Sequence, residues 1–141
     1  MFSMLDYQVH IKGESMYNTP PVFPIYVSLL TMKWLKKNGG LTWIEGINKK
    51  KAELMYAEID RNSLFTGTVE KEDRSWMNAC FLCTKPELEE TFNKMWKEAG
   101  VVGLKGHRDV GGYRASMYNA LTVEDVQALT AVMKELEKKN G

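Results

Sequence analysis

Residues 101–118 read VVGLKGHRDVGGYRASMY and place two short apolar segments on either side of a glycine-rich turn. We predict that Val101–Gly106 and Tyr113–Tyr118 are a pair of strands around this turn. Strands joined by a tight, glycine-rich connection usually pair antiparallel. The stretch therefore predicts an antiparallel part of a sheet.

Further strands and helices are predicted on the amino- and carboxyl-terminal sides of this pair. Trp76–Cys83 and Ser63–Val69 carry strand signals, and Met4–His10 is predicted to be another short strand. Apolar residues at helical spacing predict helices at Val22–Lys37, at Thr42–Arg61, from Pro86 to Gly100, and from Thr122 to the end. The order of these elements predicts an α+β fold: a small antiparallel or mixed sheet with helices on one face.

Two of the predicted helices begin with a capping-box pattern. Thr42 is followed by Glu45 and Thr122 by Asp125, so each pair of side chains can satisfy free amides at the helix start. Lys49-Lys50-Lys51 is predicted to be a charge run on the outside of its helix. The helix at 22–37 is apolar almost all round, which predicts packing partners on several sides.

The composition is that of a folded domain and not of a nucleic-acid or membrane binder. The chain has 141 residues, 44% of them hydrophobic, and a formal net charge of +1. Cys80 and Cys83 are spaced to face opposite sides of a strand, which predicts two reduced cysteines and no metal site. No signal peptide and no membrane-spanning run are visible, so a cytoplasmic location is predicted.

Two loops gather groups that can bind anions. Residues 15–21, SMYNTPP, offer an amide, a hydroxyl and backbone N–H groups just before a helix, although the same residues are typical of a plain turn. Residues 105–114 hold His107, Arg108 and Arg114 among three glycines. Arginine matches the geometry of carboxylates and phosphates, yet a hairpin with solvated charges is an equally good interpretation.

In this order, these stretches resemble the phosphoserine aminotransferases. The matching segments are SMYNTPP (15–21), KWLK (33–36) with Gly39-Gly40, RSWMN (74–78), GLKGHR (103–108) and VGGYRASMYNA (110–120). The resemblance covers nearly the whole chain. The family is a member of the class V, fold type I aminotransferases, which depend on pyridoxal 5'-phosphate.

The resemblance implies a reaction, a cofactor and partners. Phosphohydroxypyruvate and glutamate become phosphoserine and 2-oxoglutarate in serine biosynthesis, and many bacterial members also serve pyridoxine biosynthesis. The intact enzyme is a homodimer with shared active sites. By resemblance, Asn18 and Thr19 reach the cofactor phosphate of the other subunit, His107 and Arg108 lie near the substrate's distal phosphate or carboxylate, and Arg114 binds the α-carboxylate.

The resemblance also implies that the chain is the carboxyl-terminal portion of such an enzyme. Residues 1–40 would be a remnant of the large cofactor-binding domain with one helix, and residues 41–141 would be the small domain. The Schiff-base lysine would lie elsewhere, so the chain alone is predicted to hold no covalent cofactor, to contain no catalytic residue and to be inactive. The alternatives are a non-catalytic interaction module and a small-molecule-binding regulatory domain.

Overall fold

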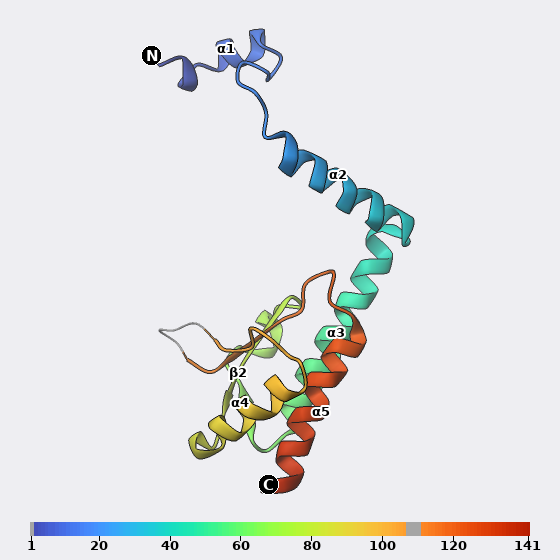
Figure 1. Cartoon of the computed structure of the whole chain (residues 1–141), viewed down its shortest axis with the longest axis vertical. Coiled ribbons are helices and arrows are strands. Elements are labelled where there is room, and N and C mark those ends of the chain that lie inside the picture. Colours follow the sequence, from blue (N-terminus) through green and yellow to red (C-terminus); the bar gives the residue numbers. More distant parts are fainter. Residues whose placement is uncertain (1, 107–110) are drawn as a thin grey trace. The chain divides into compact units, whose positions relative to one another are not determined.

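The computed structural model describes residues 2–106 and 111–141, which form two compact units, Met1–Leu41 and Thr42–Gly141. We describe each unit by itself. Figure 1 shows the elements of both in sequence colours. None of the helices in the described ranges is both long and apolar enough to cross a membrane.

The regular elements of the first unit are all helices in the residues that the structure describes. It contains the 3-10 helix η1 (Ser3–Leu5), α1 (Tyr7–Lys12) and α2 (Val22–Lys37). The predicted strand at Met4–His10 is wrong, because the Asp6 carboxylate accepts a hydrogen bond from the Gln8 amide at 2.9 Å and so caps α1. The prediction of α2 is confirmed, with the bounds as stated above. No residue of these three helices is buried.

The long helix α3 (Gly40–Arg61) begins earlier than predicted. Gly39 and Gly40 both have positive φ, the conformation that ends α2, and α3 begins directly at Gly40. Thr42 therefore lies within the first turn of α3, and the predicted capping box at Thr42 and Glu45 is wrong. The capping box at α5 (Val123–Asn140) is confirmed: the Thr122 hydroxyl accepts from the Asp125 amide, and the Thr122 amide donates to the Asp125 carboxylate.

The sheet of the second unit has three antiparallel strands in the order β1-β2-β3: Phe65–Gly67, Asn78–Cys83 and Tyr113–Ser116. Phe65 pairs with Cys83, and Phe81 pairs with Tyr113. Two 3-10 helices, η2 (Lys71–Asp73) and η3 (Pro86–Leu88), and the helix α4 (Glu89–Glu98) complete the unit. The predicted α+β class is confirmed, and the sheet is antiparallel and not mixed.

The predicted pairing of Val101–Gly106 with Tyr113–Tyr118 is only partly right. Lys105 and Tyr113 form an isolated antiparallel bridge, and the Arg114 amide donates to the Leu104 carbonyl at 2.8 Å. The extended partner of β3 is instead β2, which comes much earlier in the chain. Local turn chemistry identified the bridge, whereas the ladder depends on alternating burial along β2, in which Ala79, Phe81 and Cys83 face the core.

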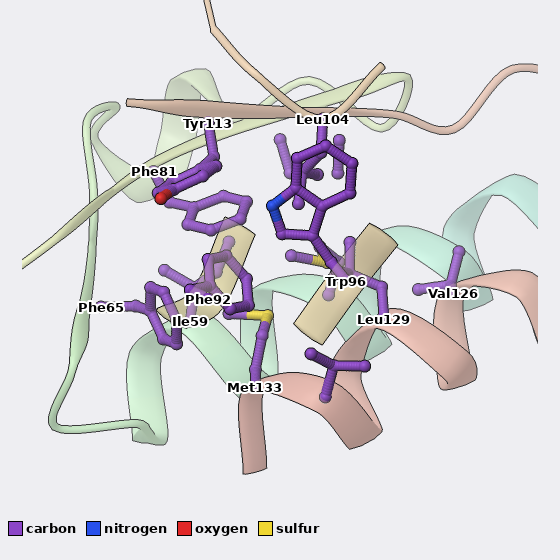
Figure 2. Close-up of a cluster of buried hydrophobic side chains, with 14 of the residues drawn as sticks. Ile59, Phe65, Phe81, Phe92, Trp96, Leu104, Tyr113, Val126, Leu129 and Met133 are labelled. Carbon is purple, nitrogen blue, oxygen red and sulfur yellow. The ribbon is translucent and has the colours of Figure 1, made fainter. Parts of the chain in front are cut away.

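The core lies between one face of the sheet and the helices α3, α4 and α5. Figure 2 shows Phe81 and Tyr113 reaching from the sheet toward Phe92 of α4, and Met133 of α5 pointing into the same cluster. The ring centroids of Phe92 and Tyr113 lie 5.0 Å apart at an angle of 82°, the edge-to-face packing that aromatic rings prefer. The helices therefore cover one face of the sheet, as predicted.

An ion pair joins α3 to the segment before β2. The Arg74 guanidinium donates to both carboxylate oxygens of Asp60, at 2.8 and 2.6 Å, and this pairing holds the pKa of Asp60 below its ordinary value of 3.8. A carboxylate with a depressed pKa in the folded state stabilises the fold above its ordinary pKa. The contribution is lost as the pH falls through the folded-state pKa.

We therefore expect the urea midpoint to fall as the pH is lowered below about 4, the ordinary range of aspartate. Asp60→Asn should lower the urea midpoint at pH 7, and the midpoint of this variant should change less as the pH is lowered. The control is Asp73→Asn in the exposed helix η2, which removes a carboxylate from the same region. An acid dependence in Asp60→Asn as steep as that of the unmodified chain would contradict the assignment.

Candidate functional site

The sheet presents Arg114 on the face that points away from the helices. Along β3, Tyr113 and Ala115 are buried and Arg114 is exposed between them, because side chains alternate across a strand. Arg114 lies opposite Cys80, and Ser116 lies opposite Asn78. We call these four residues, together with Tyr118, the outer face.

Three polar residues of the outer face, Asn78, Ser116 and Tyr118, are connected by hydrogen bonds. The Ser116 hydroxyl donates to the Asn78 side-chain oxygen at 3.1 Å, and the Tyr118 hydroxyl lies 3.5 Å from the same oxygen. The sequence identified Arg114 but missed this hydrogen-bonded group. The sequence pattern that could have revealed it is the two-residue spacing of Arg114, Ser116 and Tyr118, because residues two apart along a strand share one face.

Two glycines close the loop that precedes Arg114. The Gly106 amide donates to the Gly112 carbonyl at 2.8 Å. A Cβ on Gly112, where φ is +64°, would collide with the side chain of Leu82 and would lie 2.8 Å from the Phe81 carbonyl. Glycine is therefore required at Gly112 for conformation and for space. His107 and Arg108, the other predicted anion-binding residues, lie outside the described residues.

Arg74 and Tyr56 support the outer face from behind and are not part of its binding surface. The Arg74 guanidinium is engaged by Asp60 and lies over the Tyr56 ring, 4.6 Å from its centroid. The Tyr56 hydroxyl donates to the carbonyls of Ser75 and Asn78, at 3.0 and 3.3 Å. The segment RSWMN thus has a structural role that fixes Asn78 at the start of β2.

Lys51 is buried, so the prediction that the three consecutive lysines lie on the outside is wrong for this one. Its side chain is fully enclosed, and its ammonium donates to the carbonyls of Met117, Tyr118 and Leu121 at 3.0, 2.7 and 3.0 Å. Helical geometry explains the error, because Lys51 shares the buried face of α3 with Ile44, Asn48 and Met55. Lys49 and Lys50 are exposed, as predicted.

The loop before α2 offers donors of the kind that bind phosphate. Asn18 and Thr19 are both exposed, and Pro21 at the amino-terminal end of α2 makes no side-chain capping hydrogen bond. An amide, a hydroxyl and the start of an uncapped helix with no acidic residue in its first turn suit a phosphate group. In this respect the chain fits the phosphate of pyridoxal 5'-phosphate.

Two lysines near the sheet were possible partners for the aldehyde of that cofactor, and neither fits. Lys51, the buried one, uses its three N–H groups on carbonyls, and Lys105 is exposed at the edge of the sheet. Covalent attachment needs a lysine that can reach the cofactor and lose its proton. The described residues therefore offer donors for the phosphate of the cofactor, and neither Lys51 nor Lys105 is placed for its covalent attachment.

No metal site is formed by the described part of the chain, in which no three His, Cys, Asp or Glu side chains cluster. Cys80 and Cys83 are both free, and they face opposite sides of β2, as predicted. Burial is the main cause that raises the pKa of the Cys83 thiol. Neither cysteine therefore indicates redox or metal chemistry.

A cavity of about 220 Å³ adjoins the sheet, and Arg114 and Ser116 of the outer face are among its lining residues, together with Asp125. Most of its lining is apolar, with these side chains among it: Met55, Leu104, Met117, Leu121, Val126 and Leu129. A substrate with a carboxylate and a phosphate needs charged or hydrogen-bonding partners. The exposed outer face is therefore the better candidate site.

A protein-family match and curated relatives both connect this chain with aminotransferases. The family described as "Aminotransferase class-V" matches residues 2–129. Phosphoserine aminotransferase of Flavobacterium psychrophilum is 66% identical over 97% of this chain and 38% of the relative, and that of Flavobacterium johnsoniae is 61% identical over the same shares. The chain thus spans about two fifths of the length of the curated relatives it matches.

Solved structures agree with the sequence relatives. Phosphoserine aminotransferase from Bacillus circulans subsp. alkalophilus is 42% identical, with a TM-score of 0.89 over 100% of this chain and 39% of that one. The pyridoxal-phosphate-bound phosphoserine aminotransferase from Trichomonas vaginalis is 38% identical, with a TM-score of 0.81 over 92% of this chain and 37% of that one.

Proposed function

Because the chain belongs to the class-V aminotransferases, we propose that it forms the carboxyl-terminal part of a phosphoserine aminotransferase. Phosphohydroxypyruvate and glutamate are its proposed substrates. The observation that carries the proposal is Arg114 on the outer face, exposed on a strand whose other face is packed in the core. An arginine whose backbone is held in a strand and whose side chain is exposed can bind a carboxylate through two parallel hydrogen bonds.

The role of the chain in the reaction is to bind and orient substrate. Arg114 holds the α-carboxylate that glutamate and phosphohydroxypyruvate have in common. His107 and Arg108 bind the distal phosphate or carboxylate, since the closed Gly106–Gly112 pair brings the ends of their loop to the start of β3. Binding of this kind lowers the activation free energy, because it holds the reacting atoms in the right orientation before the chemical step begins.

Asn18 and Thr19 are proposed to bind the phosphate of pyridoxal 5'-phosphate in the other subunit of a homodimer. When bound, this cofactor supplies an electron sink for the bonds at the substrate α-carbon. The amide and hydroxyl donors fix one end of the cofactor and leave its covalent attachment to a lysine outside this chain. A cytoplasmic location remains a prediction.

The proposal is tested with a chimera in which this chain replaces the matching two fifths of the Flavobacterium psychrophilum enzyme. We expect the purified chimera, supplied with cofactor, glutamate and phosphohydroxypyruvate, to release 2-oxoglutarate. The 141-residue chain alone should release none, because the resemblance implies that the Schiff-base lysine lies outside it.

Two controls accompany this assay. The unaltered relative sets the full rate, and the relative without its matching part should be inactive. A chimera that folds and binds the cofactor but does not transfer the amino group would contradict the proposal, and so would turnover by the chain alone.

One observation favours a second candidate, an interaction module. Apolar side chains cover α2 and most of them are exposed, among them Phe23, Tyr26, Leu30 and Trp34, at 76%, 56%, 46% and 41%. A contiguous apolar surface of this kind usually marks a contact with another protein. In the intact enzyme this surface would belong to the fold and to the dimer.

We therefore expect the chain alone to self-associate through α2. Light scattering should give a mass that rises with concentration, and Phe23→Ser with Leu30→Ser should bring it toward that of a monomer. Phe2→Ser with Met4→Ser changes equally exposed apolar residues outside α2 and serves as the control. A constant monomeric mass for the unmodified chain at high concentration would contradict this second candidate.

A further inference from the structure

Lys51 is the one fully enclosed lysine in the described part of the chain, and every N–H group of its ammonium has an acceptor. The acceptors are the carbonyls of Met117, Tyr118 and Leu121, which belong to the segment that directly follows β3. An ammonium has three donors, so this set satisfies it completely. The lysine thus holds a stretch of backbone through all of its donors.

Burial of a positive charge opposes folding unless the surroundings compensate it. Burial is the main cause that lowers the pKa of Lys51, and the Asp125 carboxylate acts in the opposite direction. Asp125 is itself fixed in the capping box of α5. A lysine enclosed at such a cost, with all its donors directed at one segment, indicates that the position of that segment matters.

A second side chain on the same face of α3 holds the same segment. The Asn48 side-chain amide donates to the Asn119 side-chain oxygen at 2.8 Å, one helical turn before Lys51. Asn48 is 4% exposed, whereas Asn119 is exposed at the surface. The segment 117–121 is therefore tied to α3 at two separate places.

Met117 connects Lys51 to the outer face through hydrogen bonds on both of its sides. Met117 donates its amide to the Met77 carbonyl at 2.7 Å on the sheet side and gives its carbonyl to Lys51 on the helix side. Arg114 belongs to β3, which ends at Ser116 directly before Met117, and Tyr118 follows Met117 with its hydroxyl 3.5 Å from the Asn78 side-chain oxygen. A shift of Met117 therefore displaces the side chains of the outer face.

We propose that Lys51 is a positioning residue that fixes the end of β3 and thereby aims Arg114 and Tyr118 at the substrate. The proposal rests on the proposed role of Arg114 as the carboxylate ligand. Lys51 touches no substrate itself and acts through the backbone carbonyls that it holds.

The first test uses the full 141-residue chain and its backbone NMR spectrum. Lys51→Met should shift the amide signals of residues 117–121 and also those of Arg114 and Asn78, while the signals of β1 and of α4 stay in place. Lys50→Met, which removes an exposed lysine from the neighbouring position, should shift neither set. If Lys51→Met is folded and leaves the Arg114 and Asn78 signals unchanged, Lys51 only stabilises the fold and the proposal fails.

Asn119→Ala provides a second variant should Lys51→Met fail to fold, because Asn119 is exposed and its replacement leaves the three Lys51 hydrogen bonds in place. It should shift the signals of Arg114 and Tyr118 in the same manner but by less. Unchanged signals for Arg114 and Tyr118 in this variant would overturn the proposal, since the segment would then not transmit its position to the outer face.

The second test measures function with glutamate as the probe and with the chimera. Glutamate affinity, read from the Arg114 amide signal, should be at least about 5-fold weaker in Lys51→Met and unchanged in Lys50→Met, which corresponds to the loss of about one ordinary hydrogen bond. In the chimera, KM for glutamate should rise by a similar factor at a temperature where all variants are folded. A chimera that is inactive with Lys51 in place counts against the proposed function, and the NMR comparison still decides the role of Lys51.

Discussion

Replacing Arg114 by lysine in the chimeric enzyme is expected to lower kcat/KM for glutamate about 10- to 100-fold, because loss of one charged hydrogen bond costs about 1.5–3 kcal/mol. Lysine keeps the positive charge, so charge alone predicts little change. The guanidinium, however, offers two parallel donors in one plane, and an ammonium cannot reproduce that geometry. Steady-state kinetics with glutamate and with phosphohydroxypyruvate, both of which carry an α-carboxylate, should show the loss for each substrate.

Arg61→Lys is the matched control for this prediction. Arg61 lies at the end of α3 and pairs with Glu58 and Glu137, both at 2.8 Å. The same substitution there should lower stability slightly and leave kcat/KM within about 2-fold, since half-exposed ion pairs contribute little. Equal kinetic effects of Arg61→Lys and Arg114→Lys would show that Arg114 has no special role.

Replacing Phe81 by alanine is expected to lower the free energy of unfolding by about 3–5 kcal/mol, the usual effect of removing a buried phenyl ring. Phe81 is fully buried, and its ring centroid lies 5.5 Å from that of Phe65 and 5.4 Å from that of Tyr113. The ring joins all three strands, so its loss leaves a cavity at the centre of the core. Urea denaturation followed by circular dichroism measures the change.

Leu82→Ala provides the control on the same strand. Leu82 points to the other side of β2 and is 38% exposed. Its truncation should cost about 1 kcal/mol or less, because much of the side chain already contacts water. If Leu82→Ala destabilised the chain as much as Phe81→Ala, the assignment of the two faces of β2 would be wrong.

Elements with a strong apolar period were predictable from the sequence. The bounds of α2 match the prediction, and the alternation along β2 correctly placed the two cysteines on opposite faces. The capping box at Thr122 was predictable because a helix start that lies after a loop depends mainly on its own residues. These are cases in which local preference and the fold agree.

The errors lie where tertiary structure overrides a local pattern. Thr42 and Glu45 have the capping spacing, yet the two glycines before them already direct the chain into α3. Lys51 belongs to a run of like charges, yet its position in the helix places it on the buried face. There its ammonium donates hydrogen bonds to carbonyls of residues far along the chain. A pattern within one segment does not reveal acceptors that lie 66–70 residues away.

The candidate site was predictable only in part for the same reason. Arg114 was identified from its residue type and its glycine-rich neighbourhood, and the structure places it on the outer face. Asn78 was not singled out as a site residue, because its nearness to Ser116 and Tyr118 depends on the register of β2 and β3. The proposed ligand roles of Asn18, Thr19, His107 and Arg108 rest on resemblance.

The two edges of the sheet affect how the second unit behaves in concentrated solution. The free edge of β3 is covered, because Leu104 and Gly106 take part in hydrogen bonds with Arg114 and Gly112. The remaining edge belongs to β1, which has only three residues, Phe65–Gly67. Short or covered edges give the strand of a second molecule little backbone to pair with. The sheet is thus protected against fibril-like growth, and any aggregation of this chain should proceed through its helices.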